Sequence, residues 1–301
     1  MNYLFVLDDD LKESYLETIH DDEMVSYKYM KFNGGEPHIT ILNPIKYSNA
    51  QGVVFATKIK SGDDLLKLAA AVDAFSNLAT GADFYLEIAY YPGGRQDRVC
   101  NPGEAFSAKV YSKLIEAMAN WASVQVLDAH SDVTPAVLDN GVNNSNHRFV
   151  QNALNEIDLH EGVIISPDAG ANKKIYSVVQ VLNSKDFDFD VVRADKNRNL
   201  KTGEIIETTV YVDDLTGKDT IIIDDICDGG RTFIELAKVL KAKGAKTVTL
   251  IVTHGIFSKG FEPVLEHIDQ IVTTNSFINL DADDGDRVTV LGITEDYFKR
   301  R

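Results

Sequence analysis

The chain has 301 residues, which is enough for two domains of ordinary size. Hydrophobic residues make up 44% of it and charged residues 25%, a composition typical of folded globular proteins and not of disordered chains. The net charge of -16 argues against nonspecific binding to nucleic acid or to an anionic membrane, so neither is expected as a partner.

Cysteine usage and the first residues favour a cytoplasmic protein. Cys100 and Cys227 are the only cysteines, which argues against a disulfide framework or a zinc cluster and suits a reducing compartment. The chain starts with MNYLFVLDDD, which turns acidic at once, and no long apolar span follows. We therefore expect a soluble cytoplasmic protein without a signal peptide.

In the first half of the chain, predicted strands and helices alternate. A polar stretch at residues 139–148 has little apolar content and is a plausible domain boundary. The predicted strands are 3–7, 37–44, 52–59, 83–92 and 123–132, and the predicted helices are 63–79, which has acids at its start, and 106–119.

The second half begins again with the same kind of alternation. Residues 162–174 indicate a strand, a loop rich in glycine and acid, and a helix start. Residues 188–214 indicate a strand, a turn and a second strand. Further strands are predicted at 247–258, 270–276 and 287–293, and a short helix at 294–301. Both halves are thus predicted to be α/β with mainly parallel sheets.

The segment TIIIDDICDGGRT at residues 220–232 carries the strongest chemical signal. Its isoleucines predict a buried strand, and helical spacing from Phe233 to a glycine cap at Gly244 makes it part of a βαβ unit. Ligands of parallel sheets bind where such strands end. Glycines there allow a ligand close to the backbone, helix amides can hold a phosphate, and acids can bind sugar hydroxyls directly or through Mg²⁺. The alternative is that the acids only cap a helix in water.

This segment resembles the ribose-phosphate loop of type I phosphoribosyltransferases. A set of motifs in family order extends the resemblance to ribose-phosphate diphosphokinases, also called phosphoribosyl pyrophosphate (PRPP) synthetases, over residues 32–258. It implies two tandem phosphoribosyltransferase-like domains, 1–143 and 144–301, in a homo-oligomer that is a dimer or a hexamer. The motifs are YYPGGRQDR followed by SAK, LDAHS, SPDAG, DKNR, DDICDGGRT and VTHGIFS.

The resemblance implies an ATP-dependent transferase, which moves the β,γ-diphosphate of ATP to the 1-hydroxyl of ribose 5-phosphate with Mg²⁺ and releases AMP. Such a reaction depends on positioning and charge neutralisation. ATP would be bound by Arg95, Gln96, Asp97 and Arg98, and by Phe32 and Glu36 reaching over from a neighbouring subunit. His130, oriented by Asp128, would bind Mg²⁺–ATP, and Asp168 would be a second metal-associated acid.

The remaining implied residues act on the acceptor and on the developing charge. The resemblance assigns catalysis to Lys196 and Arg198 on a flexible loop, together with His130. The acceptor residues implied are Asp224 and Asp225 for the ribose hydroxyls, and Asp228, Gly229, Gly230 and Thr232 for the 5′-phosphate. Each motif alone has an alternative: a solvated charged loop for 95–98, a core histidine for His130, a turn for Asp168 and a polar hairpin tip for 194–199.

Four positions depart from the family pattern. Gly34 stands where an Asp or Asn is usual, which puts nucleotide selectivity in question, and Gly103 stands where an Arg is common, which puts regulation in question. Gly229 replaces a threonine and Arg231 a glycine, so the pocket loses a hydroxyl and gains space and a cation. Ordinary sequence drift in the loop would explain these two changes. An acceptor that extends beyond the 5′-phosphate, such as ADP-ribose in NAD-related metabolism, would explain them as well.

Two other classes remain open from the sequence. A phosphoribosyltransferase that consumes PRPP would account for the ribose-phosphate loop, although it needs neither the motif at 95–98 nor the one at 127–131. A non-catalytic regulatory subunit on the same fold would account for the departures at Gly34 and Gly103. Retention of Lys196, Arg198, His130 and Asp168 argues against that second alternative.

Overall fold

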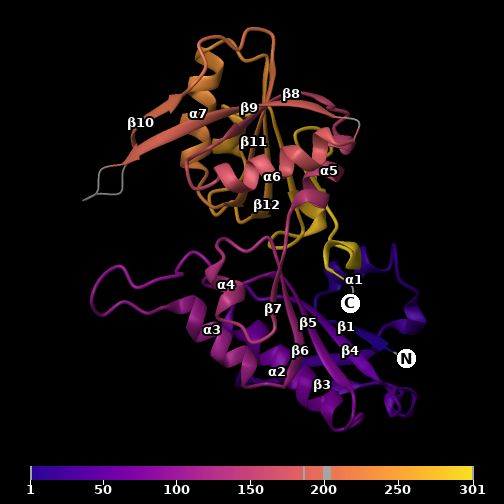
Figure 1. Ribbon diagram of the computed structural model, residues 1–301. Helices are drawn as coiled ribbons and strands as arrows, with labels where there is room; N and C mark the ends of the chain where they lie inside the picture. The colour runs from indigo at the N-terminus through magenta and orange to yellow at the C-terminus, as the bar shows by residue number, and fades with distance from the viewer. Residues whose placement is uncertain (1, 186, 199–204, 300–301) are drawn as a thin grey trace. The chain divides into compact units, whose positions relative to one another are not determined.

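The computed structural model describes residues 2–185, 187–198 and 205–299, apart from the side chains of residues 22, 196–198 and 205–207. Its contacts divide the chain into two compact units (Figure 1). One unit comprises Met1–Ser145 together with the segment that begins at Gly292, and the other comprises Asn146–Leu291. Among the described residues, every helix is too short or too polar to cross a membrane.

The first unit is an α/β structure. Its elements are β1 (Asn2–Val6), α1 (Asp9–Tyr15), β2 (Tyr27–Lys31), β3 (Pro37–Ile41), β4 (Gly52–Lys58), α2 (Gly62–Ser76), β5 (Asp83–Tyr90), α3 (Ser107–Glu116), β6 (Trp121–Leu127), α4 (Val133–Ala136) and β7 (Gly141–Asn144). In the described residues, five strands form a parallel sheet in the order β1-β4-β5-β6-β7. Strands β2 and β3 form a separate antiparallel hairpin.

The second unit has a larger sheet. Its elements are α5 (His147–Glu156), β8 (Glu161–Ser166), α6 (Asn172–Asn183), β9 (Asp188–Arg198), β10 (Ile205–Val210), β11 (Asp219–Cys227), α7 (Arg231–Ala242), β12 (Thr247–Gly255), α8 (Glu262–Leu265), β13 (Gln270–Thr274) and β14 (Val288–Leu291). The described strands run in the order β10-β9-β8-β11-β12-β13-β14, and only the β9–β10 pair is antiparallel. In Figure 1 that pair extends away from the rest of the unit as a ribbon.

Burial explains why β11 lies at the centre of this sheet. Ile221, Ile222 and Ile223 are fully buried, because β-branched side chains pack well on both faces of a parallel sheet covered by helices. Helix α7 buries one apolar stripe against this sheet through Phe233, Leu236 and Leu240. The loop between β11 and α7 is therefore held by two rigid elements, at the carboxyl edge of the sheet.

The mainly parallel α/β fold predicted from the sequence is confirmed, with differences in detail. Helices α1 and α5 and strand β2 were not predicted. The polar stretch 139–148 contains strand β7, whose backbone pairs with β6, so polarity there marks a sheet edge. Helix α7 begins at Arg231, two residues before the predicted start, while Gly244 follows its end with a φ of 91° as predicted. The predicted final helix is a single 3-10 turn at Glu295–Tyr297.

The segment from Gly292 onward packs against a different unit from the one predicted. The Lys299 backbone N–H donates to Gln125 Oε1 at 2.8 Å and to Asn144 Oδ1 at 2.9 Å, so this segment packs on the first unit. The prediction placed these residues in the second domain, because a sequence pattern does not reveal which sheet a terminal segment packs against. The boundary at residues 143 and 144 stays a prediction.

Candidate functional site

In the first unit, the predicted ATP-binding loop follows strand β5 directly, at residues 91–106, and extends outward in Figure 1. Asp97 is buried, whereas Arg95, Gln96 and Arg98 are exposed. The guanidinium of Arg98 donates from Nε to Asp97 Oδ1 at 2.7 Å and from Nη2 to Oδ2 at 3.0 Å. Asp97 thus fixes the direction in which the Arg98 cation points, which suits recognition of a phosphate.

Asp97 also connects this loop with the one that follows β6. The Arg98 guanidinium, a hydrogen bond from Ser131 and the charge of His130 together lower the pKa of Asp97 to about 2, against the opposing effect of burial. Gly94 lies beside His130, because a Cβ built on Gly94 would be 3.7 Å from the His130 Cβ. The structure therefore brings together residues 94–98 and 130–131, and their role in binding ATP stays a prediction. Ser131 was not singled out from the sequence, although the motif LDAHS contains it.

The backbone before His130 is constrained. Asp128 is buried with a φ of 43°, and its N–H donates to the Asn144 carbonyl at 2.7 Å. The next N–H, of Ala129, donates to Asn143 Oδ1 at 2.9 Å. Strand β7 thus holds the turn that presents His130, which is itself exposed. The orienting role of the Asp128 side chain stays a prediction.

The hairpin β2–β3 carries the two ATP-binding residues predicted to serve a neighbouring subunit. Phe32 and Glu36 flank its turn, where the Phe32 N–H donates to the Glu36 carbonyl at 3.0 Å. Phe32 is 52% exposed, and its ring lies 5.8 Å from that of His38. An exposed phenylalanine at a hairpin tip suits contact with another molecule, and its role at a neighbour's site stays a prediction.

In the second unit, the predicted ribose-phosphate residues share the loop between β11 and α7. Gly230 has a φ of 72° and is the N-cap of α7, so the helix begins at Arg231, and the Gly230 position provides no side-chain cap. Thr232 is the second residue of the helix, and Gly229 and Asp228 precede Gly230. This order places backbone N–H groups and the positive end of the helix dipole together, which is a suitable arrangement for a phosphate.

Two neighbouring acids lie near the end of β11, before this loop. The Asp225 N–H donates to Asp224 Oδ1 at 2.9 Å, and Asp225 is buried. Burial, and then the charge of Asp225, raise the pKa of Asp224 well above its ordinary value, and the charge of Lys174 opposes this shift. Lys174 is a residue that sequence reasoning missed. It lies in α6, and no local motif connected that helix with β11.

A second loop, after β12, packs against the first. The N–H groups of Ile256 and Phe257 both donate to the Cys227 carbonyl, at 2.8 and 3.1 Å. The Ser258 hydroxyl donates to Asp228 Oδ1 at 2.5 Å. The side chain of Lys259 lies over Gly229, with Cε 3.6 Å from the position of a Cβ built on that glycine. The motif VTHGIFS indicated this loop, but it ends one residue before Lys259.

Asp168, Lys196 and Arg198 complete the predicted set. Asp168 follows β8, and its Oδ1 accepts the Ala171 N–H at 3.0 Å, so it is at least a turn-forming residue. Lys196 and Arg198 lie near the end of β9, where their backbones pair with Thr208 and Ile205 of β10. Their side chains lie outside the described part of the chain, so their catalytic role stays a prediction.

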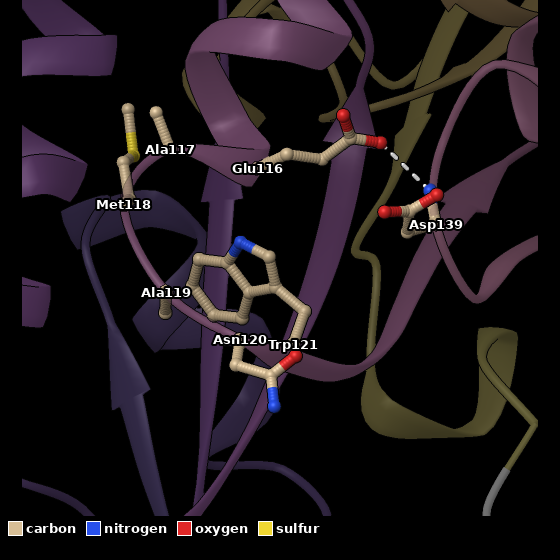
Figure 2. A pocket seen from close by; sticks show the side chains of 7 residues that line it. All are labelled: Glu116, Ala117, Met118, Ala119, Asn120, Trp121 and Asp139. Atoms are coloured by element: carbon tan, nitrogen blue, oxygen red, sulfur yellow. Dashed lines mark hydrogen bonds between the residues drawn. The ribbon is translucent and has the colours of Figure 1, made fainter.

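A cavity of about 420 Å³ lies elsewhere, at the amino end of β6. Figure 2 shows Trp121 at its centre and the Glu116 carboxylate accepting the Asp139 N–H at 2.7 Å. Trp121 is the first residue of β6, whereas His130 follows the last. The cavity therefore lies at the opposite sheet edge from the predicted ATP-binding loops, and its lining holds no cation for a phosphate: Glu116, Ala117, Met118, Ala119, Asn120, Trp121 and Asp139.

The pH dependence of protein stability provides a check on the contacts of Asp97. An acid whose folded pKa is lowered stabilises the fold above its ordinary pKa of 3.8, and this stabilisation is lost as pH falls through about 2. We expect Asp97→Asn to cost about 1 kcal/mol at pH 6, because 71% exposure of Arg98 weakens the pair by screening. Thermal unfolding should show the deficit shrinking between pH 4 and pH 2; a deficit that is constant with pH would contradict the pairing.

The protein has the type I phosphoribosyltransferase-like fold. A phosphoribosylpyrophosphate synthetase from Mycobacterium smegmatis has the same fold, with a TM-score of 0.75, 20% sequence identity and 98% of this chain and 94% of that one covered. The model of the phosphoribosyl synthetase-associated domain matches residues 197–284.

Curated relatives extend the likeness over most of the chain. A ribose-phosphate pyrophosphokinase of Pyrococcus abyssi is 27% identical over 280 residues, which are 92% of this chain and 93% of that protein. One of Campylobacter jejuni is 29% identical over 249 residues, with 82% and 77% covered. The chain is similar to ribose-phosphate pyrophosphokinases over most of its length, and it is a transferase of that type.

Proposed function

We propose that the protein transfers the β,γ-diphosphate of ATP to the 1-hydroxyl of ribose 5-phosphate and releases PRPP and AMP. In this reaction the hydroxyl oxygen bonds to the β-phosphorus, the bond from that phosphorus to the α,β-bridging oxygen breaks, and the hydroxyl proton is lost. The observation that carries the proposal is the loop after β11, where two acids precede a left-handed Gly230 and the N-terminus of α7. The similarity to ribose-phosphate pyrophosphokinases supports it.

The residues of the second unit suit the acceptor. Asp224 and Asp225 can accept hydrogen bonds from the ribose hydroxyls, and this fixes the sugar before reaction. The amides that open α7, with Gly229, Gly230 and Thr232, can hold the 5′-phosphate. The Ser258 hydroxyl fixes the Asp228 carboxylate at the side of the pocket. Holding the sugar at both ends would leave the 1-hydroxyl as the group free to react.

The residues of the first unit suit ATP. Arg98, directed by Asp97, and the exposed Arg95 can contact phosphates and stack on a base. His130 lies beside this loop and can contact the polyphosphate or its metal ion. Lys196 and Arg198 would add positive charge as the diphosphate is transferred, which lowers the barrier most if they act on the transition state.

The donor atoms fit Mg²⁺, which prefers oxygen ligands and takes many of them from substrate phosphates and water. The described residues contain no group of three or more His, Cys, Asp or Glu side chains able to hold a metal by themselves. Asp224 and Asp225 are adjacent acids whose mutual repulsion a divalent cation would relieve. They are candidate ligands in the second unit, as is Asp168, and His130 is a candidate ligand in the first unit. When bound, Mg²⁺ would neutralise phosphate charge.

An acceptor with a larger 5′ group is the alternative, and two observations favour it. Gly229 has no side chain in the loop between β11 and α7 (residues 228–230, here called the phosphate loop). Among the described residues, only the side chain of Lys259 lies within 4 Å of a Cβ built on Gly229. Arg231 is exposed at the first turn of α7. ADP-ribose, in which the 5′-phosphate continues into a second phosphate, would use both the space and the charge.

Measurement of AMP tests these possibilities. The protein is incubated with ATP and Mg²⁺, with ribose 5-phosphate or ADP-ribose, and without an acceptor to measure ATP hydrolysis. We expect AMP to form at once with ribose 5-phosphate. AMP with ADP-ribose alone would establish the alternative acceptor. No acceptor-dependent AMP with either would contradict the synthetase activity and favour a regulatory subunit or a transferase that consumes PRPP.

The assembly and the location of the enzyme remain part of the proposal. The exposed Phe32 at the hairpin tip supports a homo-oligomer, a dimer or hexamer, in which one subunit contributes to another's ATP site. Cys100 and Cys227 are both unpaired, which supports a reducing cytoplasm. Light scattering of the purified protein would give the number of subunits.

A further inference from the structure

We propose that Lys259 is a further substrate-binding residue, which binds the phosphate of the acceptor beside the α7 amides. This inference rests on the proposed function, because it assumes that the loop after β11 holds a ribose phosphate. It adds a residue from a second loop, at 256–260, to that site.

The position of Lys259 is fixed by its neighbours. The Ile256 and Phe257 N–H groups both donate to the Cys227 carbonyl, and the Ser258 hydroxyl donates to Asp228. Phe257 is buried with a φ of 43°, and its N–H bond to Cys227 turns the chain back over the phosphate loop. The loop that carries Lys259 is thus tied to the phosphate loop at two successive residues.

The Lys259 side chain extends along that loop. Its Cδ and Cε atoms lie 3.8 and 3.6 Å from where a Cβ on Gly229 would be, in ordinary van der Waals contact. The ammonium is one bond further on, so it is held close to the amides that follow Gly229. The lysine stem thus covers the side of the loop on which Gly229 has no side chain.

The charge of Lys259 has no counterpart among the residues that the structure describes. Other described lysines do form ion pairs, among them Lys31, Lys58, Lys238, Lys241 and Lys246. Lys259 forms no ion pair with a described residue, in a chain whose net charge is -16. An unpaired cation held over a phosphate loop is well placed to bind an anion, and a lysine ammonium binds phosphate as a point charge.

Binding and turnover of ribose 5-phosphate by Lys259→Gln test the inference. We expect its affinity, measured by calorimetry without ATP, and its KM to weaken roughly tenfold, the loss typical of one partly screened charge-assisted hydrogen bond. The kcat should stay within about twofold, because the substitution weakens binding of the acceptor phosphate equally in the ground state and in the transition state. Lys259→Arg should restore most of the affinity, which a purely structural role would not predict.

Lys218→Gln is the matched control. Lys218 is also exposed and without an ion pair in the described residues, but it precedes β11 at the opposite end of the strand. It should leave the affinity for ribose 5-phosphate unchanged. Unchanged affinity in Lys259→Gln as well would overturn the role of Lys259 while the proposed function stands. A wild-type protein that neither binds nor turns over ribose 5-phosphate would overturn both.

Discussion

Replacing Gly230 by alanine is expected to raise the KM for ribose 5-phosphate by roughly tenfold or more and to lower the melting temperature by several degrees. Gly230 has a φ of 72°, a conformation that costs a residue with a side chain about 1–2 kcal/mol. Its added Cβ would also lie 2.4 Å from Val264 Cγ2, which is a clash. Val264 is buried, so the phosphate loop must move instead.

The variant Gly217→Ala separates the cost of the left-handed backbone from the cost of the clash with Val264. Gly217 has a φ of 75°, and no atom lies within 4 Å of a Cβ built on it, so this variant has the backbone cost without the clash. It lies in the turn before β11, outside the candidate site. We expect a similar backbone contribution to the loss of stability but an unchanged KM. Equal changes in KM for the two variants would contradict the assignment of Gly230 to the phosphate loop.

The central strands and the phosphate loop were predictable because they depend on local sequence. Ile221–Ile223 and the glycines after them specify a buried strand and a tight turn without reference to the rest of the chain. Helix α7 was predicted two residues short, because Arg231 at a helix start is unfavourable for the dipole. Its position follows from Gly230, whose left-handed backbone ends the loop at that residue.

The contacts between segments were not predictable from local patterns. Lys174 and Lys259 lie 50 and 35 residues from Asp224, and only the order of strands β8, β11 and β12 brings their loops together. Likewise, Ser131 meets Asp97 because β5 and β6 are neighbours in the first sheet. The motifs indicated which loops are candidates for function, while the topology determined which side chains in them meet.

Asp224→Asn is expected to make the ligand-free protein more stable at neutral pH while turnover of ribose 5-phosphate falls roughly hundredfold. Burial and the charge of Asp225 raise the pKa of Asp224, so the folded state holds its proton more tightly than the unfolded state does. The free energy of unfolding therefore decreases as pH rises from the ordinary carboxyl pKa of 3.8 through the raised folded value. Asparagine removes this cost and retains an oxygen for the Asp225 N–H.

Asp219→Asn should have the opposite effect on stability, which makes it the control on the same strand. Burial of Asp219 is outweighed by hydrogen bonds from the Thr247 hydroxyl at 2.6 Å and the Lys246 ammonium at 3.0 Å, so its pKa is lowered. Its stabilisation is present above pH 3.8 and is lost at lower pH.

Melting curves of the ligand-free variants between pH 3 and pH 8 distinguish the two acids. Asp224→Asn should melt a few degrees above the wild type at pH 8, with a difference that vanishes as pH approaches 4, whereas Asp219→Asn should melt below it. A lower melting temperature for Asp224→Asn at pH 8 would show that this carboxylate stabilises the fold. An acid that weakens the fold but is needed for turnover is one whose charge serves the ligand, as expected where a sugar and a divalent cation bind.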